Sequence, residues 1–228
     1  MVKKITIALA GNPNSGKTTV FNNLTGARQH VGNWPGVTVE KKEGDRSYQG
    51  YNIKVVDLPG VYGLTAYSPD EVVARNFIVE EKPDAVVDIV DASNLERNLY
   101  LAVQLLEMGA RLIVALNMMD EAGSRKYRIN VEELSRLLGA PVVPMVANRN
   151  EGTEELLGKI IKVAEKKIEV KGLVINYGQE AEEEIAKLEK LISQDGELSG
   201  KYPPRWLAVK LLEGDEDITK KFKEVKVG

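Results

Sequence analysis

The residues whose types and spacing could do chemistry are densest in GNPNSGKT, residues 11–18. This stretch fits the pattern G-x-x-x-x-G-K-[S/T], with an apolar segment before it and a helix-forming segment after it. In that setting the loop N–H groups wrap the phosphates of a nucleotide, Lys17 reaches the β- and γ-phosphate oxygens, and the Thr18 hydroxyl binds Mg²⁺. The alternative is a glycine-rich turn without a ligand, so other motifs must decide.

A second motif, Asp57-Leu58-Pro59-Gly60, ends a later apolar segment. An aspartate at the carboxyl end of a parallel strand beside a phosphate loop can hold Mg²⁺ through water, and the following glycine can offer its N–H to a γ-phosphate. Asp-x-x-Gly alone is a common turn. Its position after the phosphate loop favours a place for Asp57 and Gly60 in the same nucleotide site.

A third motif, Asn117-Met118-Met119-Asp120, follows the apolar segment Leu112–Leu116. Guanine presents two neighbouring donors, N1–H and the 2-amino group, and one carboxylate accepts both, whereas adenine has no such pair. A pocket that leaves Asp120 unpaired should therefore reject ATP. An isolated Asn-x-x-Asp could be a helix cap, but as the third motif in order, each at a strand end, it favours guanine.

The elements that must position these motifs follow a strand–helix rhythm up to about residue 167. Strands are expected at Ile5–Ala10, Ile53–Val56, Ala85–Val90, Leu112–Leu116 and Val142–Met145, and helices near 17–26, 70–81, 95–108, 131–138 and 153–167. Residues 37–47 and 52–57 flank Tyr48-Gln49-Gly50-Tyr51 and predict a hairpin with an antiparallel edge strand. We therefore predict an α/β fold with a mostly parallel six-stranded sheet over residues 1–167.

Residues 168–228 predict a separate, small all-α domain. A helix is expected at Glu180–Ile192, a loop at 195–200, and a second helix from Tyr202-Pro203-Pro204 onward. This part carries 10 basic and 13 acidic residues, so it accounts for the net charge of −3.

Composition excludes several classes of protein. The chain has 228 residues and no cysteine, which removes disulfides, zinc thiolates and thiol catalysis and is typical of a reducing compartment. The near-neutral charge gives no reason to expect a nucleic-acid partner, and no apolar run is long enough to cross or insert into a bilayer. We expect a soluble segment.

Together the three motifs resemble the Ras-like GTPase superfamily. That resemblance implies a fourth element, a base-contacting loop, which Val146-Ala147-Asn148 matches only at its alanine, and a first-switch threonine, for which Thr38 fits. It also implies Mg²⁺ ligands at Thr18, Thr38 and Asp57. The implied nucleotide-binding residues are Asn12, Pro13, Asn14, Ser15, Gly16, Lys17, Thr18, Thr19, Asp57, Gly60, Asn117, Met118, Asp120, Val146, Ala147 and Asn148.

Within that superfamily three stretches resemble the ferrous iron transport protein B family, FeoB. They are residues 33–41 (NWPGVTVEK), 57–71 (DLPGVYGLTAYSPDE) and 203–214 (PPRWLAVKLLEG). The resemblance implies a GTP-binding, slowly GTP-hydrolysing switch at the cytoplasmic face of the inner membrane, which regulates Fe²⁺ uptake. It further implies a membrane permease domain in the full-length protein, a possible small cytosolic accessory protein, and a helical domain that slows nucleotide dissociation.

Two other functional classes stay open. A GTPase of ribosome assembly or tRNA modification would normally carry a basic RNA-binding appendage, whereas residues 168–228 are mildly acidic. The second class is a nucleotide-binding module without useful catalysis. It stays open because Val61, which cannot orient water, stands where Ras-type enzymes place a water-orienting glutamine.

Catalysis therefore needs another group beside Lys17, Thr38 and Gly60. In related GTPases an asparagine at the position of Asn14 helps to bind K⁺, with first-switch carbonyls here assigned to Gly32 and Trp34. The alternative is that Asn14 only shapes its turn.

Three further features are expected to have no catalytic or metal-binding role. His30 is expected to face solvent, Trp34 to be exposed in the first switch, and the acidic residues at 213–217 to be solvated helix ends and caps rather than an iron site.

Overall fold

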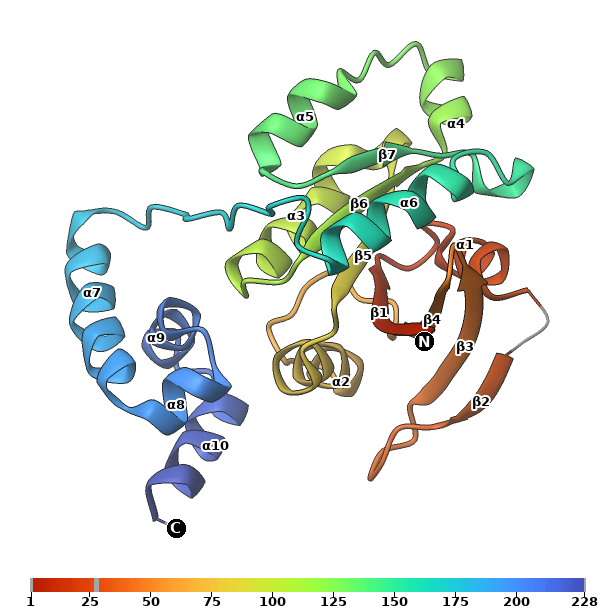
Figure 1. Cartoon of the computed structure of the whole chain (residues 1–228). Coiled ribbons are helices and arrows are strands. Elements are labelled where there is room, and N and C mark those ends of the chain that lie inside the picture. Colours follow the sequence, from red (N-terminus) through yellow and green to blue (C-terminus); the bar gives the residue numbers. More distant parts are fainter. Residues whose placement is uncertain (1, 27–28, 228) are drawn as a thin grey trace.

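The computed structural model describes residues 2–26 and 29–227, and its central feature is one seven-stranded sheet (Figure 1). The strands are β1 (Lys3–Gly11), β2 (Gln29–Asn33), β3 (Glu40–Tyr48), β4 (Tyr51–Asp57), β5 (Ala85–Asp91), β6 (Leu112–Asn117) and β7 (Val142–Pro144), in the spatial order β2-β3-β4-β1-β5-β6-β7. The pairs β4-β1, β1-β5, β5-β6 and β6-β7 are parallel, and β2-β3 and β3-β4 are antiparallel. The predicted mostly parallel α/β sheet is confirmed.

The prediction of six strands with β3 at the edge is wrong, because β2 pairs outside it. β2 runs antiparallel to β3 from Gln29 opposite Gly44 to Asn33 opposite Glu40. Most of its side chains are exposed, so it lacks the apolar pattern that identifies a strand in a sequence. Backbone pairing to its neighbour defines this strand.

The helices of the first part follow the predicted order. They are α1 (Lys17–Thr25), α2 (Pro69–Asn76) with a π-helical turn η1 (Phe77–Glu81), α3 (Leu95–Glu107), α4 (Met119–Ser124), α5 (Val131–Leu138) and α6 (Thr153–Ala164), with 3₁₀ turns η2 (Ala92–Asn94) and η3 (Ala147–Arg149). Only α4 was not predicted, because it is short and starts inside the Asn-x-x-Asp motif. At α2, Ser68 is the N-cap, because its hydroxyl accepts from the Glu71 N–H at 3.2 Å, and Pro69 occupies the first position of the helix.

The C-terminal part is helical, as predicted, but contains more helix than expected. Its elements are α7 (Gln179–Gln194), α8 (Gly196–Lys201), α9 (Pro204–Leu212) and α10 (Glu216–Val227). The predicted loop at 195–200 is wrong, because the Asp195 carboxylate accepts from the N–H groups of Glu197 and Leu198 and caps α8. We call residues 179–227 the helical module.

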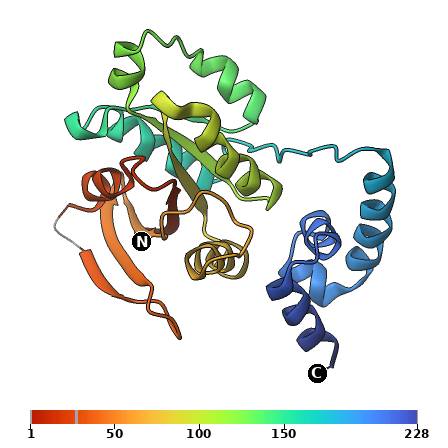
Figure 2. The ribbon, with the colours of Figure 1, turned by 180° about the vertical axis from the view of Figure 1, so that it is seen from behind.

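Two apolar cores lie on opposite faces of the sheet. One joins the sheet to α1 and α6. The other joins it to α2 and α3 and continues into the helical module through Ile185, Trp206 and Ile218. Figures 1 and 2 show the module beside α2 and α3, at the end of a long extended connection from α6. The module therefore packs directly on the sheet domain at α2. This helix follows residues 57–68, which correspond to the second switch in the resemblance to Ras-like GTPases and are called the second switch below.

A buried carboxyl, Asp88, interrupts the apolar strand β5. It pairs in register with Ala10 of β1, is 1% exposed, and its Oδ2 atom has no hydrogen-bond partner among the described residues. Burial raises the pKa of the Asp88 carboxyl to about 8. The neutral, protonated form is therefore the one that the folded state favours.

This gives a pH dependence of known sign. The pKa of the Asp88 carboxyl is higher in the folded than in the unfolded chain. Its contribution to the free energy of unfolding is therefore fully present below about pH 4 and is lost as the pH rises through about 8. We expect Asp88→Asn to flatten the unfolding free energy between those limits, by up to about 1.4 kcal/mol per pH unit relative to the parent. Urea unfolding of both proteins at several pH values measures this, and parallel pH profiles would contradict it.

Candidate nucleotide site

The three motifs meet because parallel strands end at the same edge of a sheet. β1 ends at Gly11, β4 at Asp57 and β6 at Asn117, and the β4-β1-β5-β6 run is parallel throughout. Ligands of open α/β sheets bind outside this carboxyl edge. The fold alone thus assembles residues that are more than a hundred positions apart in the sequence.

The phosphate loop is shaped by Gly16, which caps α1 in a left-handed conformation with φ of 91°. A Cβ at this position would lie 2.2 Å from the Asn117 Nδ2 atom, so only glycine fits. Lys17, Thr18 and Thr19 then form the first turn of α1, and this N-terminus directs backbone N–H groups toward the loop.

Polar side chains buried in this loop fit a polar ligand. Asn12 is 3% and Ser15 1% exposed, yet Asn12 Oδ1, Asn12 Nδ2 and Ser15 Oγ have no hydrogen-bond partner among the described residues. Buried polar atoms are rarely left unpaired in native proteins. A bound phosphate chain would supply partners that the protein itself does not.

Lys17 and Asp57 form an ion pair in the middle of the site. Burial raises the pKa of the Asp57 carboxyl, and the Lys17 ammonium acts in the opposite direction. The Asp57 carboxylate and the Thr18 hydroxyl are the hard oxygen donors that Mg²⁺ prefers, so this donor set fits the metal. Gly60 lies beside the loop as well: a Cβ there would be 3.6 Å from Pro13 Cα.

The predicted base-binding residues line one pocket. Its lining residues are Gly16, Thr19, Asn117, Met118, Asp120, Glu121, Val146, Ala147 and Asn148. Asp120 lies in the first turn of α4 and approaches the Arg149 guanidinium at 3.6 Å. Glu121 and Arg149 were not predicted, since neither belongs to a motif and only the meeting of α4 with η3 brings them here.

Asn117 ties the phosphate loop to the base pocket. It is 3% exposed; its Nδ2 donates to the Ser15 carbonyl at 3.0 Å, and its Oδ1 accepts from the Ala147 N–H at 2.9 Å. Asn23 of α1 donates to the Ala147 carbonyl at 2.8 Å, a role that sequence motifs did not reveal. Asn117 is therefore a positioning residue within the protein, with both ends of its amide already used.

Residues 30–38, which include the predicted first-switch threonine Thr38 and are called the first switch below, do not lie over the phosphate loop in this structure. The expected exposure of Trp34 is wrong: it is 9% exposed, and its ring packs edge-on against Phe77 at 5.4 Å between centroids. Burial of the large apolar ring of Trp34 is favourable even within a polar segment of the sequence. The Trp34 carbonyl accepts from the Val37 N–H at 3.3 Å. Gly32 pairs with β3, Thr38 is exposed, and no hydrogen bond among the described residues joins residues 32–38 to the phosphate loop.

Asn14 is exposed at the tip of the phosphate loop in a left-handed conformation with φ of 67°. Asparagine is the non-glycine residue that tolerates this conformation best, so its turn-shaping role is realised. Its exposed amide is free of the bonds that hold Asn117.

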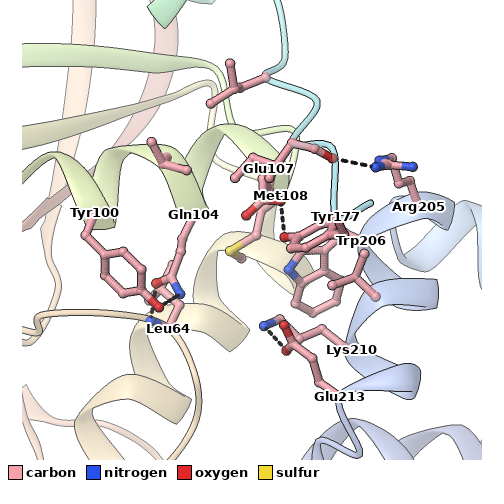
Figure 3. Close-up of a pocket in the computed structure, with 14 residues that line it drawn as sticks. Leu64, Tyr100, Gln104, Glu107, Met108, Tyr177, Arg205, Trp206, Lys210 and Glu213 are labelled. Atoms are coloured by element: carbon pink, nitrogen blue, oxygen red, sulfur yellow. Dashed lines mark hydrogen bonds and ion pairs between the residues drawn. The ribbon is translucent and has the colours of Figure 1, made fainter. Parts of the chain in front are cut away.

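The second switch is fastened at two points. The Val61 N–H donates to the Gly11 carbonyl at 3.2 Å, and the Leu64 N–H donates to Gln104 Oε1 of α3 at 2.7 Å. Gln104 Nε2 donates in turn to the Tyr100 hydroxyl at 3.1 Å. Figure 3 shows these side chains on one wall of a pocket, with Trp206 and Lys210 of α9 on the other. The second switch thus adjoins the helical module.

No cluster of three or more His, Asp or Glu suited to a metal ion occurs among the described residues. His30 is exposed, as predicted. Of the acidic residues at 213–217, Glu213 and Glu216 are exposed and Asp215 caps α10, as expected, but Asp215 is not solvated because its side chain is buried against Arg75.

Fold and site together define the P-loop GTPase fold of the Ras-like class with an added helical module. Residues 5–160 match the family model of ferrous iron transport protein B, and residues 177–227 match that of the FeoB cytosolic helical domain. The chain belongs to the ferrous iron transport protein B family.

Relatives extend this comparison. The Fe(2+) transporter FeoB of Escherichia coli K12 is 48% identical over 219 residues, covering 94% of this chain and 27% of that protein. A fusion of Fe(2+) transport protein A with FeoB from Porphyromonas gingivalis is 44% identical over 218 residues, covering 95% and 26%. The chain thus spans about a quarter of the length of these relatives.

Solved structures of the cytosolic domain of the T. maritima FeoB iron transporter superpose closely. The GDP form gives a TM-score of 0.90 at 42% identity, over 99% of this chain and 87% of that one. The GMPPNP form gives 0.90 at 42% identity, over 98% and 86%. Both forms share the fold described above.

The double role of Asn117 predicts a large effect of its loss. Asn117→Ala leaves the Ala147 N–H and the Ser15 carbonyl buried without partners, so we expect about 2–4 kcal/mol of lost stability. Urea unfolding measures the loss, and GDP titration should show weakened binding as the two loops separate. Asn148→Ala, at an exposed position in the same pocket, is the control and should leave stability unchanged. A loss below about 0.5 kcal/mol for Asn117→Ala would contradict the assignment.

Proposed function

We propose that this chain binds GTP and GDP with Mg²⁺, hydrolyses GTP slowly, and serves as the switch of a ferrous iron transporter. The observation that carries the proposal is the pocket that places Asp120 beside Gly16 of the phosphate loop, with Asn117 joining its two halves. A carboxylate there suits the two donors of guanine. The GDP and GMPPNP forms of the T. maritima relative support the same ligand class.

Residue roles follow from this placement. The loop from Asn12 to Thr19 holds the phosphates, and Lys17 turns from Asp57 to the β- and γ-phosphates. Thr18, Asp57 and, after first-switch closure, Thr38 are the proposed Mg²⁺ ligands, and the metal when bound neutralises charge on the phosphate oxygens. Gly60 offers its N–H to the γ-phosphate. Met118, Val146, Ala147 and Asn148 border the base.

Hydrolysis must proceed without a glutamine, because Val61 is 5% exposed and apolar. We infer that K⁺ supplies the missing charge, held by the exposed amide of Asn14 with carbonyls of Gly32 and Trp34. This requires the hairpin turn at Trp34 to open, since its carbonyl is engaged with Val37 here. The opening is the conformational cost that GTP binding has to offset.

We propose that residues 1–167 form a GTP-binding domain and that residues 168–228 form a helical domain that slows nucleotide dissociation. In the full-length protein, both would lie at the cytoplasmic face of the membrane, next to a membrane permease domain. The fusion in Porphyromonas gingivalis supports a small accessory protein as a further partner. Within residues 2–26 and 29–227 no helix is both long and apolar enough to cross a membrane. Family membership and the mildly acidic module favour this function over a ribosome-assembly or tRNA-modification GTPase.

Base specificity should depend on Asp120. Asp120→Asn loses an acceptor for the guanine amino group, so GDP affinity should fall by at least about a hundredfold. Xanthosine diphosphate affinity should rise, because the C2 carbonyl of xanthine accepts from the new amide. Fluorescent-nucleotide competition measures both, with Glu121→Gln in the same pocket as the control that keeps the parental preference. Unchanged GDP affinity in Asp120→Asn would rule out this role.

Turnover should depend on K⁺ through Asn14. The parent should hydrolyse GTP at about 10⁻⁴ to 10⁻² s⁻¹ unassisted and faster in K⁺ than in Na⁺, because a cation near the bridging oxygen stabilises charge that develops in the transition state. Asn14→Gly keeps the left-handed turn and removes the amide, whereas Asn14→Ala also strains the turn.

Both Asn14 variants should lose most of the K⁺ response with little change in GDP affinity, because the ion acts mainly in the transition state. Phosphate-release assays in matched K⁺ and Na⁺ buffers measure this. Equal parental rates in the two salts, or full K⁺ activation in Asn14→Gly, would refute the mechanism.

A further inference from the structure

Asn23 joins α1, the helix that follows the phosphate loop, to the turn that borders the base pocket. Its Nδ2 atom donates to the Ala147 carbonyl at 2.8 Å, across 124 positions of sequence. Thr19, which lines the pocket, lies four residues before Asn23 and therefore on the same face of α1. Asn23 is not one of the described residues that line the pocket. Its contact with the base site thus passes through Ala147.

Both backbone polar groups of Ala147 are held by asparagine side chains. The Ala147 N–H donates to Asn117 Oδ1 at 2.9 Å, and the Ala147 carbonyl accepts from Asn23. The carbonyl also accepts from the Asn150 N–H at 3.0 Å, a bond inside the turn itself. A carbonyl oxygen has two lone pairs, so both bonds can be made. The bond inside the turn fixes the shape of the turn, whereas the bond to Asn23 fixes the carbonyl relative to α1.

The bond to Asn23 also sets the direction of the next backbone N–H group. The Ala147 carbonyl and the Asn148 N–H belong to one planar trans peptide, in which the two groups point in opposite directions. Because the carbonyl is turned toward Asn23, the Asn148 N–H is turned away from it. This N–H makes no hydrogen bond within residues 2–26 and 29–227, and Asn148 lines the base pocket. A backbone donor is therefore available at the pocket.

A donor of this kind distinguishes two purines at the 6-position of the base. Guanine carries the acceptor O6 there, whereas adenine carries an amino group, which donates. A backbone N–H can therefore bond to guanine and is left unpaired by adenine. This contact is separate from the one at Asp120, whose carboxylate suits the N1–H and the 2-amino group of guanine.

We propose that Asn23 is a positioning residue for base recognition: it holds the Ala147 carbonyl so that the Asn148 N–H faces O6 of guanine. The inference rests on the proposed guanine-nucleotide function. Without the Asn23 amide, Ala147 stays bonded to Asn117, but no other hydrogen bond among the described residues joins α1 to this peptide. Recognition at O6 then weakens, whereas recognition at the 2-amino group stays with Asp120.

The test compares nucleotides that differ from GDP at one position of the base. The diphosphate of 6-thioguanosine keeps the N1–H and the 2-amino group but replaces O6 by sulfur, which is a weaker acceptor. Inosine diphosphate keeps O6 and the N1–H but lacks the 2-amino group. Titration calorimetry with Mg²⁺ on the whole chain gives the dissociation constant of each analogue relative to that of GDP.

Two substitutions at Asn23 remove the donor in different ways. Asn23→Ala deletes it, and Asn23→Asp keeps the size of the side chain but places an acceptor there. Each should weaken GDP binding by about fivefold, as expected for one hydrogen bond, and should reduce the penalty for sulfur to less than about half of the parental value. The penalty for inosine diphosphate should not change.

Asn22→Ala is the matched control, because it makes the same substitution at the exposed neighbour in α1. The Asn22 side chain accepts only from Gln29, whose amide also bonds Thr25 and Gly26. This variant should keep the parental affinity for all three nucleotides. Circular dichroism checks that each variant is folded, and Asn23→Asp carries the test should Asn23→Ala fail to fold.

The outcomes separate a role in base recognition from a merely structural one. Weaker GDP binding with an unchanged penalty for sulfur would mark Asn23 as a structural contact only and overturn the proposal. Parental affinities in the Asn23 variants, or a parent that binds GDP and its 6-thio analogue equally, would also overturn it. A parent that binds no guanine nucleotide would instead refute the proposed function, and that result is read from the parent alone.

Discussion

The pair of hydrogen bonds made by the Asn117 amide is the constraint on which the nucleotide site depends. One bond fixes the Ser15 carbonyl in the phosphate loop and the other fixes the Ala147 N–H in the base pocket. Both bonds are buried, so neither can be exchanged for water without cost. The close approach of Asn117 to Gly16 also explains why this position of the loop excludes any side chain. The phosphate loop and the proposed base pocket are thus joined into one unit at the carboxyl edge of the sheet.

The two segments named as switches lie around that unit. The first switch is turned away, with Trp34 packed on Phe77, and the second switch is fastened to Gly11 and Gln104. Both attachments lie on the face of the sheet that also carries the helical module. Rearrangement of either switch therefore disturbs a core that the module shares. This shared core is the physical basis on which the proposed coupling of nucleotide state to the helical module would rest.

Much of the fold and the centre of the site could be predicted from the sequence, because local patterns specify them. Buried parallel strands read as apolar runs, and Gly16, Lys17 and Asp57 belong to motifs whose spacing is set by one turn or one strand end. What could not be predicted depends on contacts between distant segments. β2 exists by pairing with β3, Trp34 is buried by meeting Phe77, and Asp215 is buried by meeting Arg75. Asp88 was missed for a different reason, since one carboxyl inside an apolar run does not change the strand pattern.

The central claim is that a site held together by Asn117 and bordered by Asp120 selects guanine nucleotides. Titration calorimetry of the parent chain with GDP and with ADP, each with Mg²⁺ under identical conditions, tests it most directly. We predict that GDP binds at least about a hundredfold more tightly than ADP, because only guanine offers two donors to the Asp120 carboxylate. Equal affinities for the two nucleotides would contradict the account.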